Sequence, residues 1–221
     1  MSNGAVFHYA YAGEALTRLH VCSCATTAAG HKYPYIIGSG TASAGDYAVN
    51  VVCSATSFTE NMFQGGQLVV SSQVAGLEAT QNLLIKSHPV ATTGQTIEMK
   101  LLTPVQTTFT SQSKCGLIRN PFYGVEKMDF TAVNHPIGIT NIAVTTNYYF
   151  WLQTWGPCAG INDAAPPVVG GPVAVSSTNQ GGISEHVVTT IAAGIYPPIG
   201  MCGPYASLDD ETSPIFLMLV P

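Results

Sequence analysis

The chain has 221 residues and a mass of 23.2 kDa, enough for one large β domain or two small ones with a proper core. Only 9% of its residues are charged, against roughly 25% in an average soluble domain, so its surface must consist largely of uncharged polar groups. The net charge is −5 and the seven Lys and Arg residues are scattered, which excludes a basic stripe for nucleic acid.

The predicted elements of the first half are short strands separated by turns. Residues 21–27 are predicted to be extended, and residues 32–45 a strand followed by a loop. Alternation of apolar and polar residues then predicts four strands, at 47–53, 67–74, 82–87 and 96–101. Residues 13–21 could form a short helix, but we assign extended structure because the following stretch prefers a strand, and residues 57–64 could hold a helical turn.

A connector is predicted at Asn120-Pro121-Phe122-Tyr123-Gly124, because proline restricts the residue before it and glycine permits a turn. We therefore predict two β lobes, 1–118 and 119–221, or one continuous domain. The second half contains further predicted strands at 137–145, 148–155, 172–176, 185–190 and 214–220. The fold class predicted is all-β, an antiparallel sandwich or barrel-like structure with very little helix.

The most aromatic stretch is 148–155, which contains both tryptophans of the chain. With a period of two, Tyr149, Trp151 and Trp155 share one face, and Tyr148 and Phe150 share the other. Bulky groups on both faces predict a central strand or a subunit interface, and the following Gly-Pro pair is expected to end the strand. A platform on which sugars stack is the alternative, which we favour less because adjacent rings alternate sides.

No apolar run approaches the roughly 18 residues needed to span a bilayer, so no membrane partner is expected. The first residues do not have the charged and apolar regions of a secretory signal, and we expect assembly in a cytoplasm. In that reducing compartment the cysteines are expected to be free thiols; they are Cys22, Cys24, Cys53, Cys115, Cys158 and Cys202.

His20, Cys22, Cys24 and His31 are the best candidate metal ligands. On one strand, alternate side chains point the same way, but successive ligands would lie ~7 Å apart and the outer two ~13 Å. That span is too wide for tetrahedral zinc unless a bulge shortens it. A strand with half-buried thiols is the favoured interpretation, and we expect no metal and no cofactor.

No converging catalytic constellation is found. The glycine- and serine-rich stretch 38–45 contains neither Gly-x-Ser-x-Gly nor the Gly-Lys-Ser/Thr ending of a phosphate-binding loop. His8, His88, His135 and His186 are isolated in the sequence, which is typical of structural or exposed histidines. We expect no catalytic residues and no enzyme activity.

Several blocks together resemble the head decoration, or capsid cement, proteins of tailed bacteriophages. The most specific are Asn120-Pro121-Phe122-Tyr123-Gly124 and Gln153-Thr154-Trp155-Gly156-Pro157. The resemblance extends over most of the chain, at residues 9–16, 65–70, 84–89, 96–101, 119–125, 147–157 and 214–219.

This resemblance implies an all-β structural virion protein that binds the exterior of a capsid and stabilises it. The implied partner is the major capsid protein, with the chain forming a homo-oligomer on the capsid lattice and no cofactor. Low charge, an uncharged polar surface and many turns are compatible with such an adhesive module. A receptor-binding module of a tail or fibre, and a stand-alone hydrolase, stay open as alternatives.

Overall fold

The structure is a computed structural model, and it describes residues 4–32, 36–53, 55–72, 80–129, 134–163, 166–186, 198–207 and 211–220. Within these ranges every regular element is a β-strand except one 3-10 turn, η1 (Ala29–His31). The predicted all-β, barrel-like fold class is thereby confirmed. The described part of the chain has no helix whose length and apolar character would allow it to cross a membrane.

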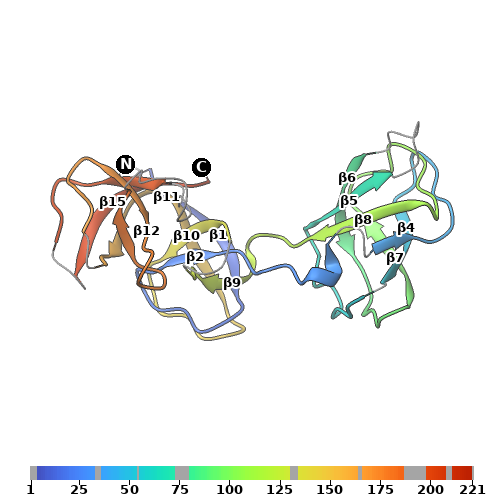
Figure 1. Cartoon of the computed structure of the whole chain (residues 1–221), viewed down its shortest axis with the longest axis horizontal. Coiled ribbons are helices and arrows are strands. Elements are labelled where there is room, and N and C mark those ends of the chain that lie inside the picture. The colour runs from blue at the N-terminus through green and yellow to red at the C-terminus, as the bar shows by residue number, and fades with distance from the viewer. Residues whose placement is uncertain are drawn as a thin grey trace. The chain divides into compact units, whose positions relative to one another are not determined.

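Two compact units make up the chain, and they differ from the predicted lobes (Figure 1). Unit 1 comprises residues 1–25 and 121–221, and unit 2 comprises residues 26–120. The boundary near residue 120 agrees with the expected connector, but residues 1–25 join the second half instead of the first lobe, 1–118. Tertiary pairing causes this difference, since two strands from the N-terminal segment hydrogen-bond to strands of the C-terminal half.

Unit 2 is a closed barrel with the strand order β3-β4-β7-β6-β5-β8. Its strands are β3 (Ile36–Gly38), β4 (Ala48–Cys53), β5 (Gln67–Ser72), β6 (Gln81–Ser87), β7 (Thr96–Leu101) and β8 (Ser113–Ile118). Their inward side chains form one apolar cluster, which includes Leu68, Ile85 and Met99. A closed barrel leaves no unpaired sheet edge, so each of the six described strands of this unit has a hydrogen-bonded neighbour on both sides.

In unit 1, five strands pair into a ring: β1 (Val6–Ala12), β9 (Tyr123–Lys127), β2 (Val21–Ser23), β10 (Pro136–Thr140) and β11 (Tyr149–Ile161). β1 closes the ring, because it pairs parallel with β9 and antiparallel with β11. Inside it, Phe150, Leu152 and Val125 belong to one apolar cluster with Ala10 and Ala12. The small alanine side chains leave room for the larger rings and branched groups opposite them.

Beyond the ring, β11 continues into a sheet with β15 (Thr212–Met218), β14 (Pro198–Cys202), β12 (Pro172–Val175) and β13 (Ile183–Glu185). The inner side of this extension shares a second core with Val21 of β2 and Ile139 of β10. Since neighbouring Cys22 belongs to the core inside the ring, β2 separates the two cores and is buried on both faces.

A β-bulge in β11 decides which of its side chains are exposed. Gln153 stands opposite Phe7 and Trp155 opposite Val6, so β11 advances by two residues where β1 advances by one. Residues directly opposite one another share a face, and therefore Gln153 and Trp155 lie on opposite faces. The expectation that Tyr149, Trp151 and Trp155 share one face is wrong for this reason.

The expected end of the strand at Gly156-Pro157 is also wrong, since β11 continues to Ile161. Gly156 adopts a φ of +90°, and a Cβ there would lie 2.7 Å from the Gly4 carbonyl oxygen. The Gln153 side-chain amide donates to the carbonyl oxygens of Trp155 (3.1 Å) and Pro157 (2.9 Å). These bonds satisfy backbone acceptors at the irregular step, and β11 pairs with β15 from Trp155 to Ile161.

Among the other predictions, the strand at 96–101 has the predicted bounds, and those at 47–53 and 82–87 differ from β4 and β6 by one residue at most. The stretch 57–64 forms turns and a bridge at Phe58, without a helix. Residues 73–74 and 187–190 of two predicted strands lie outside the described residues. Strands β1, β8, β9 and β14 were not predicted as strands.

The two faces of β11 predict unequal effects of truncation. Leu152 is fully buried in the ring, whereas Trp151 next to it is 60% exposed. We expect Leu152→Ala to reduce the free energy of unfolding by about 2–5 kcal/mol, because it leaves a cavity. Trp151→Ala should cost about 1 kcal/mol or less, although it removes the larger side chain. Denaturant unfolding of both variants measures these changes. A larger loss of unfolding free energy for Trp151→Ala than for Leu152→Ala would contradict the assignment of the two faces.

Candidate functional site

The five aromatic residues predicted to lie in a core or an interface separate into different environments. Phe150 is 4% exposed and belongs to the core inside the ring. Tyr148, Tyr149 and Trp151 are 65%, 57% and 60% exposed, and Trp155 is half-buried. Of these five aromatic residues, Phe150 alone is buried in the core of this chain. Core packing therefore does not account for the exposed side chains of Tyr148, Tyr149 and Trp151.

Five rings form a continuous row on the outer face of β9, β1 and β11, which we call the aromatic row: Tyr123, Tyr11, Tyr149, Tyr9 and Trp151. Tyr123 and Tyr11 are stacked with ring centroids 4.9 Å apart, as are Tyr149 and Tyr9 at 5.1 Å. The contacts from Tyr11 to Tyr149 and from Tyr9 to Trp151 are tilted by 57°. Each ring thus touches the next one, in spacings at which aromatic pairs attract.

Strand register produces this row. Tyr9 stands opposite Trp151, Tyr11 opposite Tyr149, and Tyr11 also opposite Tyr123. Opposite residues have Cβ atoms about 5 Å apart on one face, which is within reach of ring-to-ring contact. Tyr9, Tyr11 and Tyr123 were missed as site residues, although Phe7, Tyr9 and Tyr11 alternate with smaller side chains as on a half-buried strand.

The two strands that carry most of the row have no charged residue: neither β1 nor β11 contains Asp, Glu, Lys or Arg. The hydroxyl of Tyr11 donates to Oδ1 of Asn147 at 3.1 Å. Asn147 adopts a φ of 66° in the turn before β11, a conformation that asparagine tolerates better than most residues. Over β1 and β11 the site is thus an uncharged aromatic surface with phenol hydroxyls and one fixed amide, whereas β9, which carries Tyr123, contains Glu126 and Lys127.

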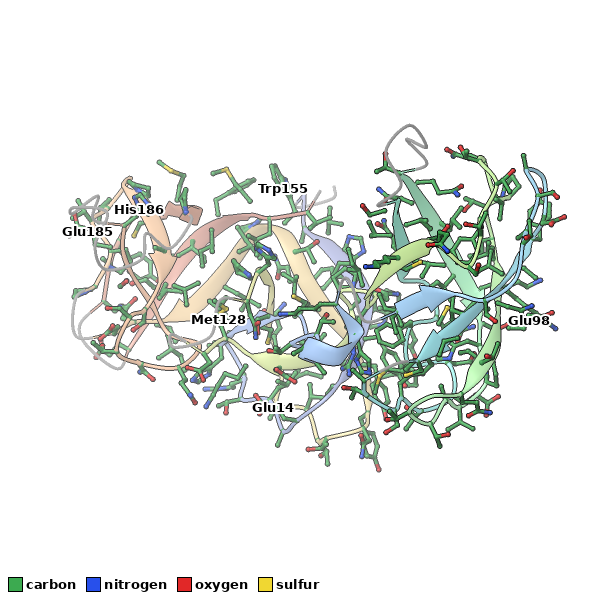
Figure 2. The ribbon with its side chains drawn as sticks, turned by 45° about the vertical axis from the view of Figure 1, so that its right-hand side comes forward. Glu14, Glu98, Met128, Trp155, Glu185 and His186 are labelled. Carbon is green, nitrogen blue, oxygen red and sulfur yellow. The ribbon has the colours of Figure 1, made fainter. Side chains whose placement is uncertain are left out.

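A second exposed apolar group lies further along the sheet. Trp155, labelled in Figure 2, contacts Phe216 edge-on, with ring centroids 6.0 Å apart. Met218 stands opposite Trp155, and Met201 stands opposite Phe216. Phe216, Met218 and Met201 are 37–41% exposed. Because of the bulge, this group and the aromatic row project from opposite faces of β11.

The candidate metal ligands are not brought together. His20, Cys22 and Cys24 belong to unit 1, whereas His31 lies in unit 2. Cys22 is fully buried in the ring core, and burial raises the pKa of its thiol, which opposes the thiolate that zinc requires. Among the described residues, no three His, Cys, Asp or Glu side chains are grouped so that they could hold a metal ion.

His31 instead packs in the barrel core of unit 2. Its ring contacts Phe58 and Phe63 edge-on at 5.6 and 5.2 Å, and Nε2 lies 3.3 Å from the Ser57 carbonyl oxygen. His88 completes this cluster, with its ring 5.0 Å from Phe58. Burial lowers the pKa of both histidines, and the positive charge of Arg119 lowers that of His31 further.

Two hydrogen bonds set the tautomer of the neutral His88 ring. Nε2 accepts the backbone N–H of Phe63 at 3.0 Å, so the ring proton must be on Nδ1, 2.8 Å from the Pro89 carbonyl oxygen. A proton on Nε2 would place two donors against each other. This arrangement fixes the 59–65 turns on the end of β6, and gives the histidine a structural role.

Other polar groups are likewise used in structure. Buried Asp163 accepts from the hydroxyls of Ser176 and Thr178, and the Ser176 hydroxyl also accepts the Asn179 N–H at 2.7 Å. All six cysteines are free, as expected, and burial raises the pKa of the Cys115 and Cys158 thiols to about 12. Among the described hydrogen bonds, none joins the hydroxyl of Ser176 or Thr178 to a histidine that could act as its base. The Cys115 and Cys158 thiols are poor nucleophiles, because a raised pKa disfavours the thiolate.

Comparison of the chain with protein-family models, with curated proteins and with solved structures gave no match.

The buried histidines predict an acid-sensitive barrel. Their folded pKa lies below the ordinary value of 6.5, so the unfolded chain binds more protons. The contribution of the two neutral histidines to the free energy of unfolding is present above about pH 6.5. It should fall as the pH decreases below that value, by no more than ~1.4 kcal/mol per pH unit for each histidine. Hydrogen exchange of barrel amides at pH 7.5 and 5 measures this loss.

His88→Gln should flatten that pH dependence, since an amide can accept from Phe63 and donate to Pro89 without titrating. His135→Gln is the control, because His135 is exposed and lies in unit 1. Equal barrel stability at the two pH values in the unchanged protein would contradict the prediction.

Proposed function

We propose that the chain is a structural virion protein that binds the outer surface of a bacteriophage capsid and stabilises it, as a decoration or cement protein. In this proposal it is assembled in the host cytoplasm, forms a homo-oligomer on the capsid exterior and contacts the major capsid protein. It performs no reaction and needs no cofactor. The resemblance of the 119–125 and 147–157 blocks to this class of protein is the starting point.

The aromatic row is the observation that carries the proposal. Tyr9, Tyr149 and Trp151 each expose more than half of their surface on two strands without a charged residue. Exposed, contiguous aromatic groups of this kind mark surfaces that bind another molecule. Tyr and Trp are also among the residue types enriched in the few positions that dominate the binding energy of protein interfaces.

Low charge suits binding to a crowded lattice. With 9% charged residues, neighbouring copies repel one another weakly even at close spacing. Each copy needs only a modest affinity, since copies that also touch their neighbours are held at high effective concentration. Compact β units with their own cores supply rigid bodies, so little conformational entropy is lost on binding.

A receptor-binding module of a tail or fibre is the second candidate. Trp151 favours it: among the described ring contacts it touches only Tyr9, at one end of the row, and it is 60% exposed. A free indole face is suited to stacking on a sugar ring. In that case the chain would bind host cells or glycans, and its deletion would abolish adsorption instead of weakening heads.

The discriminating experiment uses expanded heads assembled from a major capsid protein encoded in the same genome as this chain. The purified chain should sediment with these heads and raise their melting temperature, because it binds the expanded state. Heads of an unrelated phage are the control. Failure to sediment with the expanded heads at any salt concentration between ~0.05 and ~0.5 M would refute the proposal.

A further inference from the structure

We infer that the aromatic row is the docking surface for an uncharged protein surface of the shell, which it contacts through ring edges and phenol hydroxyls. This inference rests on the proposed function, and it specifies the residues and the chemistry of the contact.

Charge is the first reason. β1 and β11, which carry four of the five aromatic side chains, contain no Asp, Glu, Lys or Arg, and the charged residues of β9 are Glu126 and Lys127 at the end of the strand away from Tyr123. A charged partner surface would lose its hydration against this row and gain no opposite charge in return. The matching surface is therefore apolar or uncharged polar, with groups that can accept or donate to a phenol hydroxyl. Binding through such a contact depends little on salt.

Ring orientation is the second reason, and it argues against a glycan. The planes of Tyr9 and Tyr149 are within 4° of parallel, and those of Tyr11 and Tyr123 within 10°. The three central rings, Tyr11, Tyr149 and Tyr9, each contact two other rings. Their faces are turned toward one another, whereas a sugar stacks on a free face. Edges and hydroxyls are left for the partner, as in aromatic-rich protein interfaces.

Rigidity is the third reason. The three central side chains, Tyr11, Tyr149 and Tyr9, each lie between two neighbouring aromatic side chains on the β1–β11 strand pair. The Tyr11 hydroxyl is also bonded to Asn147. Immobilising a free, rotamer-rich side chain costs about 0.5–1.5 kcal/mol on association. In the aromatic row most of that ordering has already occurred in the unbound protein. The surface is thus preorganised for a partner with a fixed shape.

The test compares variants of the whole chain for binding to expanded heads. Tyr9→Ala and Trp151→Ala remove exposed rings, and Tyr149→Glu places a charge in the centre of the row. Tyr205→Ala is the matched control, because Tyr205 is 59% exposed in the same unit, against 58% for Tyr9. Tyr47→Ala is the corresponding control in unit 2, also 59% exposed.

We expect each row variant to bind heads at least about tenfold more weakly and the two controls to bind as the unchanged chain does. Circular dichroism and thermal unfolding establish that the variants remain folded. Affinity of the unchanged chain should vary less than about twofold between ~0.05 and ~0.5 M salt.

The outcomes separate the two proposals. If the unchanged chain binds heads and the row variants bind equally well, the docking surface is refuted while the capsid function stands. If the unchanged chain does not bind heads, both fall. Sedimentation in solution that shows dimers dissociated by the row variants would instead identify a second copy as the occupant, and a glycan array bound through Trp151 would identify a sugar; either result overturns the inference.

Discussion

The antiparallel pairing of β1 with β11 is the interaction on which the rest of unit 1 depends. It brings residues 6–11 beside residues 149–155 and closes the five-strand ring. It also places Tyr9 against Trp151 and Tyr11 against Tyr149. One strand register therefore determines both the apolar core inside the five-strand ring and the aromatic side chains on its outer face. A slip of one residue would exchange these faces, which makes the register costly to change.

The bulge at Thr154 lets one long strand serve two different surroundings. Before it, β11 has the ring core on one face and solvent on the other; after it, the strand becomes part of the sheet that covers β2 and β10. Gln153 lies at this change and is buried, with its amide bonded to Asn141 and to two carbonyl oxygens. A buried polar side chain with its partners satisfied is stable there, and it stabilises the irregular backbone.

The alternation of apolar and polar residues predicted strands well where one face of the strand is exposed to solvent and the other is buried. β7 was predicted from its alternation because Ile97, Met99 and Leu101 are buried and their neighbours are charged or polar. β1 was missed, since Phe7 and Tyr9 are exposed aromatic residues, Tyr11 is half-buried, and Ala10 and Ala12 are the buried ones, which inverts the usual pattern. The candidate ligands His20 and His31 are near one another in the sequence, but the chain passes from one unit into the other between them.

The sequence by itself determined the all-β class, the low charge and the absence of a local catalytic motif, because these follow from composition, period-two patterns and turn residues. Only the tertiary structure decided that residues 1–25 complete the second unit and that the aromatic rings gather outside it in a row. Both depend on pairing between segments more than a hundred residues apart. Local propensity does not record such pairing, since the free energy that selects it comes from burial and register across the whole sheet.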